Sequence, residues 1–204
     1  MASILIPPDQ ELFPGRKRWT YKEVDQLIAT GKLVGRYELI DGEIIDKMGQ
    51  NPQHSLSIML VMQYLLTAFD ARYVRVQLPI LIPGEDGETN APEPDGAVTR
   101  EASDAFRHQH PMPADLRLLV EVSDTTLAFD LNTKALLYAR ASVQEYWVVN
   151  IRERQIHVHR APTSSGYTDI LVLSESALLA PLARLDAVVA VGTLLPSPDD
   201  AVKE

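Results

Sequence analysis

The pattern of hydrophobic and polar positions predicts an α/β fold, with a mixed sheet flanked by helices. Residues 117–122 contain a short run of bulky aliphatic side chains after Arg117, with one acid, Glu121, among them. Such a run is typical of a strand that is buried on both faces. Capping-type residues follow at 123–126, and the next segment has the spacing of a helix to about Ala141. We therefore expect a central strand followed directly by a helix that packs on the sheet.

The same pattern predicts the remaining elements and a single domain. In chain order we expect a helix at 20–30, a hairpin with strands at 37–40 and 43–46, a helix at 53–70, a long strand at 73–83, a strand that begins at Asp95, a hairpin at 145–150 and 154–160, and a strand at 167–173. Residues 1–19 are expected to form an irregular arm, residues 20–195 one domain, and residues 196–204 a frayed tail.

The segment from Gln53 to Asp70 is apolar on nearly every side of a helix. A helix of this kind must be covered on all sides, so we expect the sheet on one side and a second subunit on the other. Ser55, Ser57 and Gln63 interrupt the segment, which is too short and too broken for a membrane span. The sequence therefore predicts a homodimer and no membrane partner.

Lys134 lies in the apolar stripe of the helix predicted at 126–141. At 100° per residue, three apolar or aromatic residues fall within about 60° of one another and of the lysine: Leu127, Leu131 and Tyr138. A lysine that points at a core without a counter-charge tends to lose its proton, so an anion should meet Lys134. In one of two open interpretations, Lys134 pairs with Asp130 one turn earlier. In the other, it reaches past the stripe to Asp95 and Glu121 at the ends of the strands.

Asp95, Glu121 and Lys134 could meet at one point in the fold. Asp95 opens one predicted strand, Glu121 lies near the end of the next, and the lysine is on the following helix. Two acids and an amine at one point suit a divalent metal and a phosphate. An ionised carboxylate on a strand buried on both faces also needs a cation nearby.

These residues, with Asp130, Tyr138 and the segment Glu145–Val149, resemble the PD-(D/E)XK nuclease superfamily and, within it, the bacterial Uma-type restriction endonuclease family. In the usual superfamily motif the lysine stands two residues after the second acid, a position held here by Ser123. In the Uma-type family the lysine lies on the next helix, as it does here. The resemblance covers roughly residues 20–160. It implies a restriction-endonuclease-like fold and a metal-dependent endonuclease, with DNA as the expected substrate.

The resemblance also implies a mechanism. Asp95 and Glu121, with the main-chain carbonyl of Val122, are expected to hold Mg²⁺, with Mn²⁺ as a substitute. The ion would lower the pKa of a bound water and steady the charge that develops on the scissile phosphate. Lys134 would hydrogen-bond the attacking water or the phosphate as a compact point charge.

Three further residues are candidates for the site. In the resembled family an early acid in the hairpin lies near the metal, so Glu38 is a candidate catalytic residue, as an auxiliary ligand or an orienting group. An exposed alternate position on a half-buried strand explains Glu38 equally well. His54 matches a histidine of the same family and either contacts substrate or caps its helix. Gln77, which interrupts the apolar run at 73–83, is a candidate substrate-binding residue.

The overall charge of the chain does not favour nucleic-acid binding. With 28 acidic and 19 basic residues, the formal net charge is −9. Sequence-independent affinity for DNA comes mainly from Lys and Arg side chains that neutralise phosphates. Two short basic groups are candidates for a local DNA surface, although solvated charge explains both of them: Arg16, Lys17 and Arg18, and Arg152, Arg154 and Arg160.

Cysteine and histidine usage narrows the kinds of site that the chain offers. With no cysteine, it has neither a disulfide framework nor a thiolate metal site. The first 20 residues lack a basic start followed by an apolar run, and we expect a cytoplasmic protein. His157 and His159 alternate with Ile156 and Val158 along a predicted strand, which predicts that both histidines face solvent.

Two other classes of function remain open. One is a non-catalytic descendant of the nuclease fold that serves as a binding or assembly module, which the net acidity and the apolar helix at 53–70 favour. The other is a metal-independent hydrolase that uses Asp95 and Glu121 as an acid/base pair. Lys134 on the same face argues against it, because a nearby cation lowers the pKa that a general acid needs raised.

Overall fold

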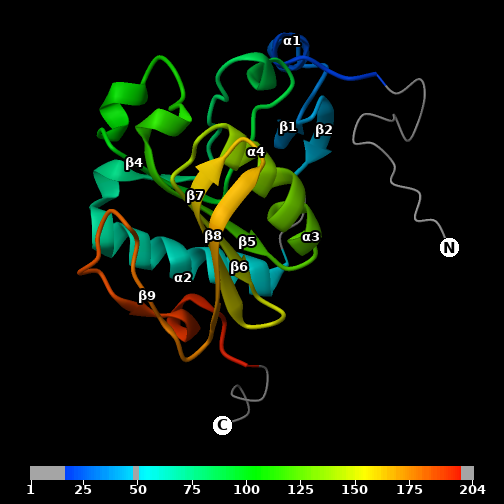
Figure 1. Cartoon of the computed structure of the whole chain (residues 1–204). Helices are drawn as coiled ribbons and strands as arrows, with labels where there is room; N and C mark the ends of the chain where they lie inside the picture. The colour runs from blue at the N-terminus through cyan, green and yellow to red at the C-terminus, as the bar shows by residue number, and fades with distance from the viewer. Residues whose placement is uncertain (1–16, 48–50, 199–204) are drawn as a thin grey trace, which may run out of the picture.

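The fold is built on a six-stranded mixed sheet (Figure 1). The computed structural model describes residues 17–47 and 51–198, so most of the predicted arm and tail, at 1–16 and 199–204, lies outside the described residues. β5 and β6 run parallel, and the other neighbouring pairs are antiparallel. The α/β class expected from the sequence is confirmed. In spatial order the strands are β3 (Val74–Val76), β4 (Gly96–Thr99), β5 (Leu116–Ser123), β6 (Glu145–Asn150), β7 (Gln155–Thr163) and β8 (Gly166–Ser174).

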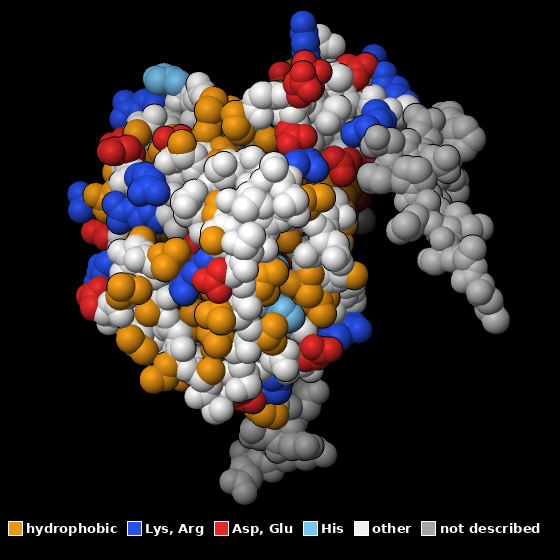
Figure 2. All heavy atoms as spheres, viewed as in Figure 1, with side chains coloured by type: hydrophobic (Ala, Val, Ile, Leu, Met, Phe, Trp, Pro, Cys, Tyr) orange, Lys and Arg blue, Asp and Glu red, His pale blue; other side chains and the backbone are white. Residues whose placement is uncertain are grey.

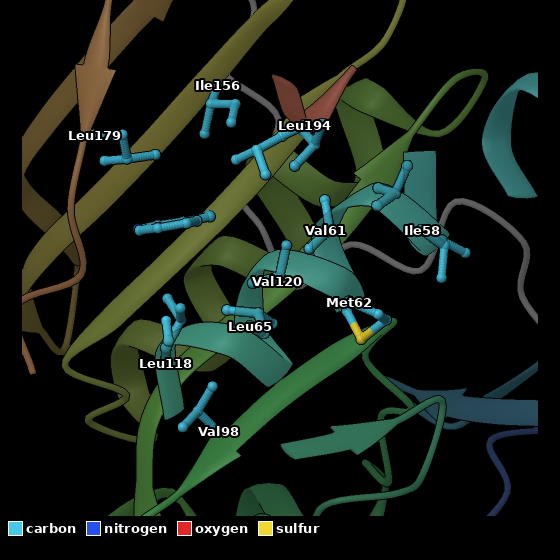
Figure 3. Close-up of a cluster of buried hydrophobic side chains, with 14 of the residues drawn as sticks. Ile58, Val61, Met62, Leu65, Val98, Leu118, Val120, Ile156, Leu179 and Leu194 are labelled. Atoms are coloured by element: carbon cyan, nitrogen blue, oxygen red, sulfur yellow. The ribbon is translucent and has the colours of Figure 1, made fainter. Parts of the chain in front are cut away.

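The central strand β5 separates two hydrophobic cores. One of its faces packs against α2 (Pro52–Phe69) through Leu118, Val120 and Val122. Figure 3 shows side chains of α2 and β5 meeting in this core. Leu119 points to the other face, into the core beneath the helical segment 127–140. Because successive side chains of a strand alternate between faces, Glu121 lies on the side of Leu119, inside the protein.

The helix predicted after β5 forms, but it is not a regular α-helix. The short helix α3 (Leu127–Phe129) leads into a π-helical turn at Asp130–Lys134, and α4 (Ala135–Arg140) completes the segment. A π-helical turn widens the helix locally and is frequent at functional sites. Here the two residues that bound the turn, Asp130 and Lys134, are both buried.

The C-terminal segment of the chain covers part of the second side of the apolar helix α2, where the sequence predicts a second subunit, but Leu56, Met59 and Leu66 stay exposed. The C-terminal segment that covers it carries the short strand pair β9 (Leu178–Leu179) and β10 (Val189–Ala190). Tyr64 OH donates a hydrogen bond to Ala187 O over 2.7 Å. The homodimer stays a prediction, which the exposed apolar side chains of Leu56, Met59 and Leu66 on α2 still favour. Several side chains of the C-terminal segment join the α2 core, namely Leu179, Val191, Leu194 and Leu195.

An N-terminal helix and a hairpin form as the sequence predicts. Helix α1 (Tyr21–Ala29) begins with the predicted capping box. Strands β1 (Tyr37–Ile40) and β2 (Glu43–Asp46) form the hairpin. Two main-chain hydrogen bonds between Leu39 and Ala91, of 3.2 and 2.8 Å, tie β1 to the loop that precedes β4. In the described part of the chain, no helix has the length and apolar character needed to cross a membrane.

The prediction of a long strand at 73–83 is wrong in its length, because β3 ends one residue before Gln77. Gln77 adopts a left-handed backbone conformation, with φ 50°, and its N–H donates to the carbonyl of Asp95 over 3.1 Å. The chain leaves the sheet at this turn. The apolar residues that follow, such as Ile80 and Ile82, are buried in the second core without belonging to a strand.

The prediction of a solvent-facing His159 is also wrong. The side chain is 4 % exposed and lies between Tyr146 and Tyr167, with ring centroids 5.5 Å from each. Neither ring nitrogen has a hydrogen-bond partner among the described residues. Polar and apolar residues alternate along β7, as in a strand with one face in solvent. Packing against β6 and β8 nevertheless buries His159.

Acidification should destabilise the fold through His159. Burial, helped by the neighbouring His157, lowers the pKa of His159 to about 4. The unfolded chain binds a proton near the ordinary histidine value of about 6.5, so the stabilising effect of the neutral ring is full near pH 7 and is lost as the pH falls towards 4. Between pH 7 and pH 5, the free energy of unfolding of the wild-type protein should fall by about 1–2 kcal/mol more than that of His159→Phe. Urea denaturation at both pH values measures it.

His108, which is exposed in the loop after β4, offers a matched control. His108→Phe should keep the pH dependence of the wild-type protein. If His159→Phe also kept it, the buried histidine would not be the source of the effect.

Candidate active site

Neighbouring strands bring Asp95 and Glu121 together. β4 and β5 are antiparallel, with Gly96 opposite Val120. Asp95 immediately precedes Gly96 and therefore lies beside Glu121. Its Oδ2 accepts a hydrogen bond from the N–H of Val122 over 2.9 Å. The backbone of β5, the strand that carries Glu121, thus holds the carboxylate of Asp95.

Lys134 lies between two carboxylates. Its Nζ is 2.8 Å from Glu121 Oε1 and 2.9 Å from Glu38 Oε2, and its side chain is 3 % exposed. The carboxylate of Asp130 instead accepts a hydrogen bond from Thr126 Oγ1 over 2.6 Å. Of the two interpretations of Lys134, the structure supports the one in which it reaches the strands, but of the two acids expected there it pairs with Glu121 and not with Asp95. The second acid that it meets is Glu38 on the hairpin.

Glu38 does not occupy an exposed alternate position, and that alternative is wrong. The side chain is buried, and its Oε2 also accepts a hydrogen bond from the Glu93 N–H over 3.3 Å. The hairpin therefore supplies an acid to the same place as the sheet and the helix. The predicted role of Glu38 as an orienting group or auxiliary ligand stays a prediction.

Burial determines the charge balance of the site. Burial raises the pKa of Glu121, and the nearby Lys134 and Lys47 offset this only in part. Burial alone would lower the pKa of Lys134, but the carboxylates around it, chiefly Glu121 and Glu38, raise it above the ordinary lysine value. The ammonium group therefore stays charged. Two ammonium groups face four buried carboxylates, and this excess of acids favours a further cation. The buried acids are Glu38, Asp95, Glu121 and Asp130.

These groups surround a cavity of about 180 Å³, which we call the acidic cavity and which is lined by Glu38, Lys47, Asp95, Glu121, Asp130 and Lys134, among others. In residues 17–47 and 51–198, no three His, Asp or Glu side chains form a ready-made metal cluster. Mg²⁺ does not need one, because it usually binds through one or two carboxylates, several waters and substrate phosphates. The oxygen donors of Asp95 and Glu121 and the excess negative charge therefore fit a magnesium ion.

His54 lies against the carbonyl that the sequence suggests as a metal ligand. Its Nε2 is 2.7 Å from the Val122 carbonyl oxygen and 3.7 Å from Asp95 Oδ2. The alternative in which His54 caps its helix is wrong, because Asn51 caps α2 by accepting a hydrogen bond from the His54 N–H over 2.9 Å. A carbonyl oxygen has two lone pairs, so Val122 can still bind a second partner. Contact of His54 with substrate stays a prediction.

Gln77 holds Asp95 from the opposite side. Its Nε2 donates to Asp95 Oδ1 over 3.2 Å, and its Oε1 accepts a hydrogen bond from Arg36 Nη1 over 2.9 Å. Arg36 also pairs with Glu93 in the loop before β4. These contacts suit an orienting group for Asp95, and the predicted substrate contact of Gln77 stays a prediction.

Sequence reasoning missed Lys47, the second lysine of the acidic cavity. Strand alternation carries the signal that could have found it. Ile45 lies opposite Glu38 in the hairpin, and Lys47 follows Ile45 by two positions. Side chains two apart on a strand point to the same face. The spacing therefore places Lys47 on the face that carries Glu38.

The two short basic groups are largely paired with acids. Figure 2 shows basic and acidic side chains side by side around the rim of one face of the molecule. Arg16 lies outside the described residues. Solvated or paired charge therefore explains these groups better than a DNA surface does. The ion pairs are Lys17–Glu23, Arg152–Asp124, Arg154–Glu175 and Arg160–Glu145.

A mixed sheet with helices on both faces and an acidic cavity at the ends of two central strands defines a nuclease-like α/β fold. A crystal structure of a "putative nuclease belonging to DUF820" from Anabaena variabilis ATCC 29413 is similar, with a TM-score of 0.62 over 82 % of this chain and 96 % of that chain. At 16 % sequence identity the likeness concerns the fold alone. This chain belongs to the Uma2 family, described as "Putative restriction endonuclease", whose family model matches residues 23–191. The resemblance seen in the sequence is confirmed, and no curated protein matches the chain.

Removing the charge of Lys134 should destabilise the fold. Lys134→Met leaves the carboxylates of Glu38 and Glu121 buried without their cation, a change that typically costs about 3–5 kcal/mol. We expect a loss of that size in the free energy of unfolding at pH 8, measured by urea denaturation. The loss should be smaller at pH 5, where the unpaired carboxylates can bind protons.

The exposed Lys32 provides the control, and Lys32→Met should change the free energy of unfolding by less than about 0.5 kcal/mol. Adding Glu121→Gln to Lys134→Met should recover part of the loss, because one buried charge is then removed with its partner. Equal stability of Lys134→Met and the wild-type protein would show that the buried ion pair is not needed.

Proposed function

We propose that this protein is a Mg²⁺-dependent endonuclease that hydrolyses phosphodiester bonds in DNA. The observation that carries the proposal is the acidic cavity, where buried carboxylates outnumber ammonium groups at the ends of two neighbouring strands. A surplus of buried oxygen donors suits a divalent cation, and a lysine beside them suits a phosphate. Membership of the Uma2 family supports a nuclease.

Asp95 and Glu121, with the carbonyl of Val122, would hold the ion, and we expect Mn²⁺ to substitute for Mg²⁺. When bound, the ion supplies positive charge that makes a water more acidic and stabilises the charge that develops on the phosphate. The protein contributes fixed positions for the oxygen ligands. Four donors hold the two carboxylates, namely the Val122 N–H and Gln77 on Asp95, and Lys134 and Tyr138 on Glu121.

Lys134 keeps one ammonium N–H after it has donated to Glu38 and Glu121. We assign to this N–H the donation to the attacking water. Glu38 is then the group that orients the ammonium. The ring of His54 lines the acidic cavity and is the candidate for a contact with the substrate.

We further propose that the protein acts in the cytoplasm as a homodimer. A two-fold pair of sites suits the cutting of both strands of a duplex. The outer strand β8 supports this proposal, because it has a free edge and carries the exposed apolar side chains of Ile170, Leu171 and Val172. A monomeric mass in solution would contradict it.

A second candidate function is a non-catalytic binding or assembly module built on the nuclease fold. The net charge of −9 favours it, as does the pairing of Arg152, Arg154 and Arg160 with carboxylates. These arginines are engaged within the protein, so they offer little free charge to phosphates. The third possibility from the sequence, a metal-independent acid/base pair, is disfavoured by the Lys134 ammonium 2.8 Å from Glu121.

Cleavage should require both strand acids and a divalent ion. We expect the wild-type protein to cut plasmid or single-stranded DNA with Mg²⁺ or Mn²⁺ and to lose this activity with a chelator. Asp95→Asn and Glu121→Ala should each lower the rate at least 100-fold, because the first removes the negative charge of one ligand and the second removes the other ligand. Gel assays with purified variants measure the rates.

Asp25→Asn on the exposed surface of α1 is the matched control for loss of an acid, and it should cut at the wild-type rate. If the wild-type protein cut neither substrate with either ion, the non-catalytic module would be favoured. Activity that survived in Asp95→Asn would point to a contaminating nuclease.

Metal affinity should depend on the protonation of Glu121. Burial raises the pKa of Glu121 to about 8, so many of the metal-free carboxyl groups bind a proton near neutral pH, and the ion must displace it. Affinity for Mn²⁺, measured by calorimetry, should therefore rise from pH 6 to pH 8. Glu121→Gln should bind at least tenfold more weakly and with a shallower pH dependence. The same affinity and pH profile in Glu121→Gln would remove this residue from the ligand set.

A further inference from the structure

We propose that Lys47 is the lysine that contacts the substrate, and that its ammonium group binds a non-bridging oxygen of the scissile phosphodiester. The inference rests on the proposed nuclease function and adds a residue to its site. It is based on the different surroundings of Lys47 and Lys134, the two lysines of the acidic cavity. One is enclosed by carboxylates, whereas the other lies where a phosphate could reach it.

The hairpin fixes Lys47 beside the cavity. Its N–H donates to the Arg36 carbonyl over 2.9 Å, which continues the β1–β2 pairing by one residue beyond Tyr37 and Asp46. Lys47 therefore keeps the alternation of β2 and shares the face of Glu38. Its side chain enters the acidic cavity from the hairpin, while Lys134 enters from the helix.

Among the described residues, no carboxylate oxygen lies within hydrogen-bond distance of the Lys47 ammonium group. Its Nζ donates to the main-chain carbonyl of Glu93, a neutral acceptor, and the nearest carboxylate oxygen is Asp95 Oδ1 at 3.9 Å. Its side chain is 15 % exposed, against 3 % for Lys134. Lys134 by contrast touches two carboxylates at 2.8 and 2.9 Å. Of the two ammonium groups, that of Lys47 is the one available to an incoming anion.

A phosphodiester is the anion that fits this arrangement. An ammonium group is a compact point charge with three N–H donors, and it binds single phosphate oxygens well. Lys47 also stands beside Asp95, where the proposed ion would lie. It should repel a divalent cation that binds alone and attract the phosphate that accompanies it. Removing its charge should therefore change the affinities for metal and for substrate in opposite directions.

The first test measures binding of metal alone. In calorimetry with Mn²⁺ and no DNA, Lys47→Met should bind at least threefold more tightly than the wild-type protein, because a cation next to Asp95 has been removed. The exposed Lys32→Met should bind as the wild type does. If Lys47 only supported the shape of the site, Lys47→Met would bind Mn²⁺ more weakly, and that result would overturn the proposal.

The second test removes the ammonium group and then restores it. The chain has no cysteine, so Lys47→Cys introduces a unique thiol. Alkylation of this thiol with 2-bromoethylamine places an ammonium group at nearly the lysine length. We expect kcat/KM for DNA cleavage to fall at least 30-fold in Lys47→Cys and to recover at least tenfold after alkylation. Lys32→Cys should cleave at the wild-type rate before and after the same treatment.

The outcomes separate this proposal from the proposed function. Comparison of one protein before and after alkylation also excludes a simple failure to fold. If the wild-type protein cut DNA and Lys47→Cys cut equally well, Lys47 would have no role in catalysis, and the nuclease function would stand. If the wild-type protein cut no DNA with either ion, the nuclease function would fall, and the proposal for Lys47 would fall with it.

Discussion

A carboxylate inside an apolar sheet must be met by a cation, and this requirement shapes the protein around Glu121. The strand that carries it is buried on both faces, and an unpaired carboxylate there would be costly. Lys134 meets it from the helical segment, and Glu38 meets Lys134 from the hairpin. These two ion pairs therefore join the sheet and the helical segment that follows it to a hairpin that lies much earlier in the sequence.

The site contains more buried negative charge than stability alone would require. Buried ion pairs are often no more stabilising than apolar residues of similar volume, so a group with surplus acids is a burden on the folded state. A cation that binds there would stabilise these acids, and their excess therefore points to a functional role. Asp130 and Lys134, the two residues that bound the π-helical turn, are both buried and belong to this group. The fold thus concentrates charge at one cavity and keeps the surrounding sheet apolar.

Local patterns predicted those elements whose cause lies within a few residues. The hairpin followed from Asp41-Gly42, helix α1 from its capping box, and β5 from a run of aliphatic residues. The patterns were misleading where the cause was distant. The strand before Gln77 ends early because that residue turns to hydrogen-bond Asp95, and His159 is buried by residues of β6 and β8.

The sequence by itself determined which charges lie in apolar surroundings, because a single acid in an aliphatic strand or a lysine in an apolar stripe is visible without coordinates. Glu121 and Lys134 could be selected on that basis, and Asp95 from its place at the start of a predicted strand and from the family resemblance. Only the tertiary structure decided which partner each charge meets. It placed Glu38 on Lys134 and brought Lys47 into the same cavity. Such contacts join residues that are distant in the chain, and they depend on strand register and on the packing of layers, which are properties of the whole fold.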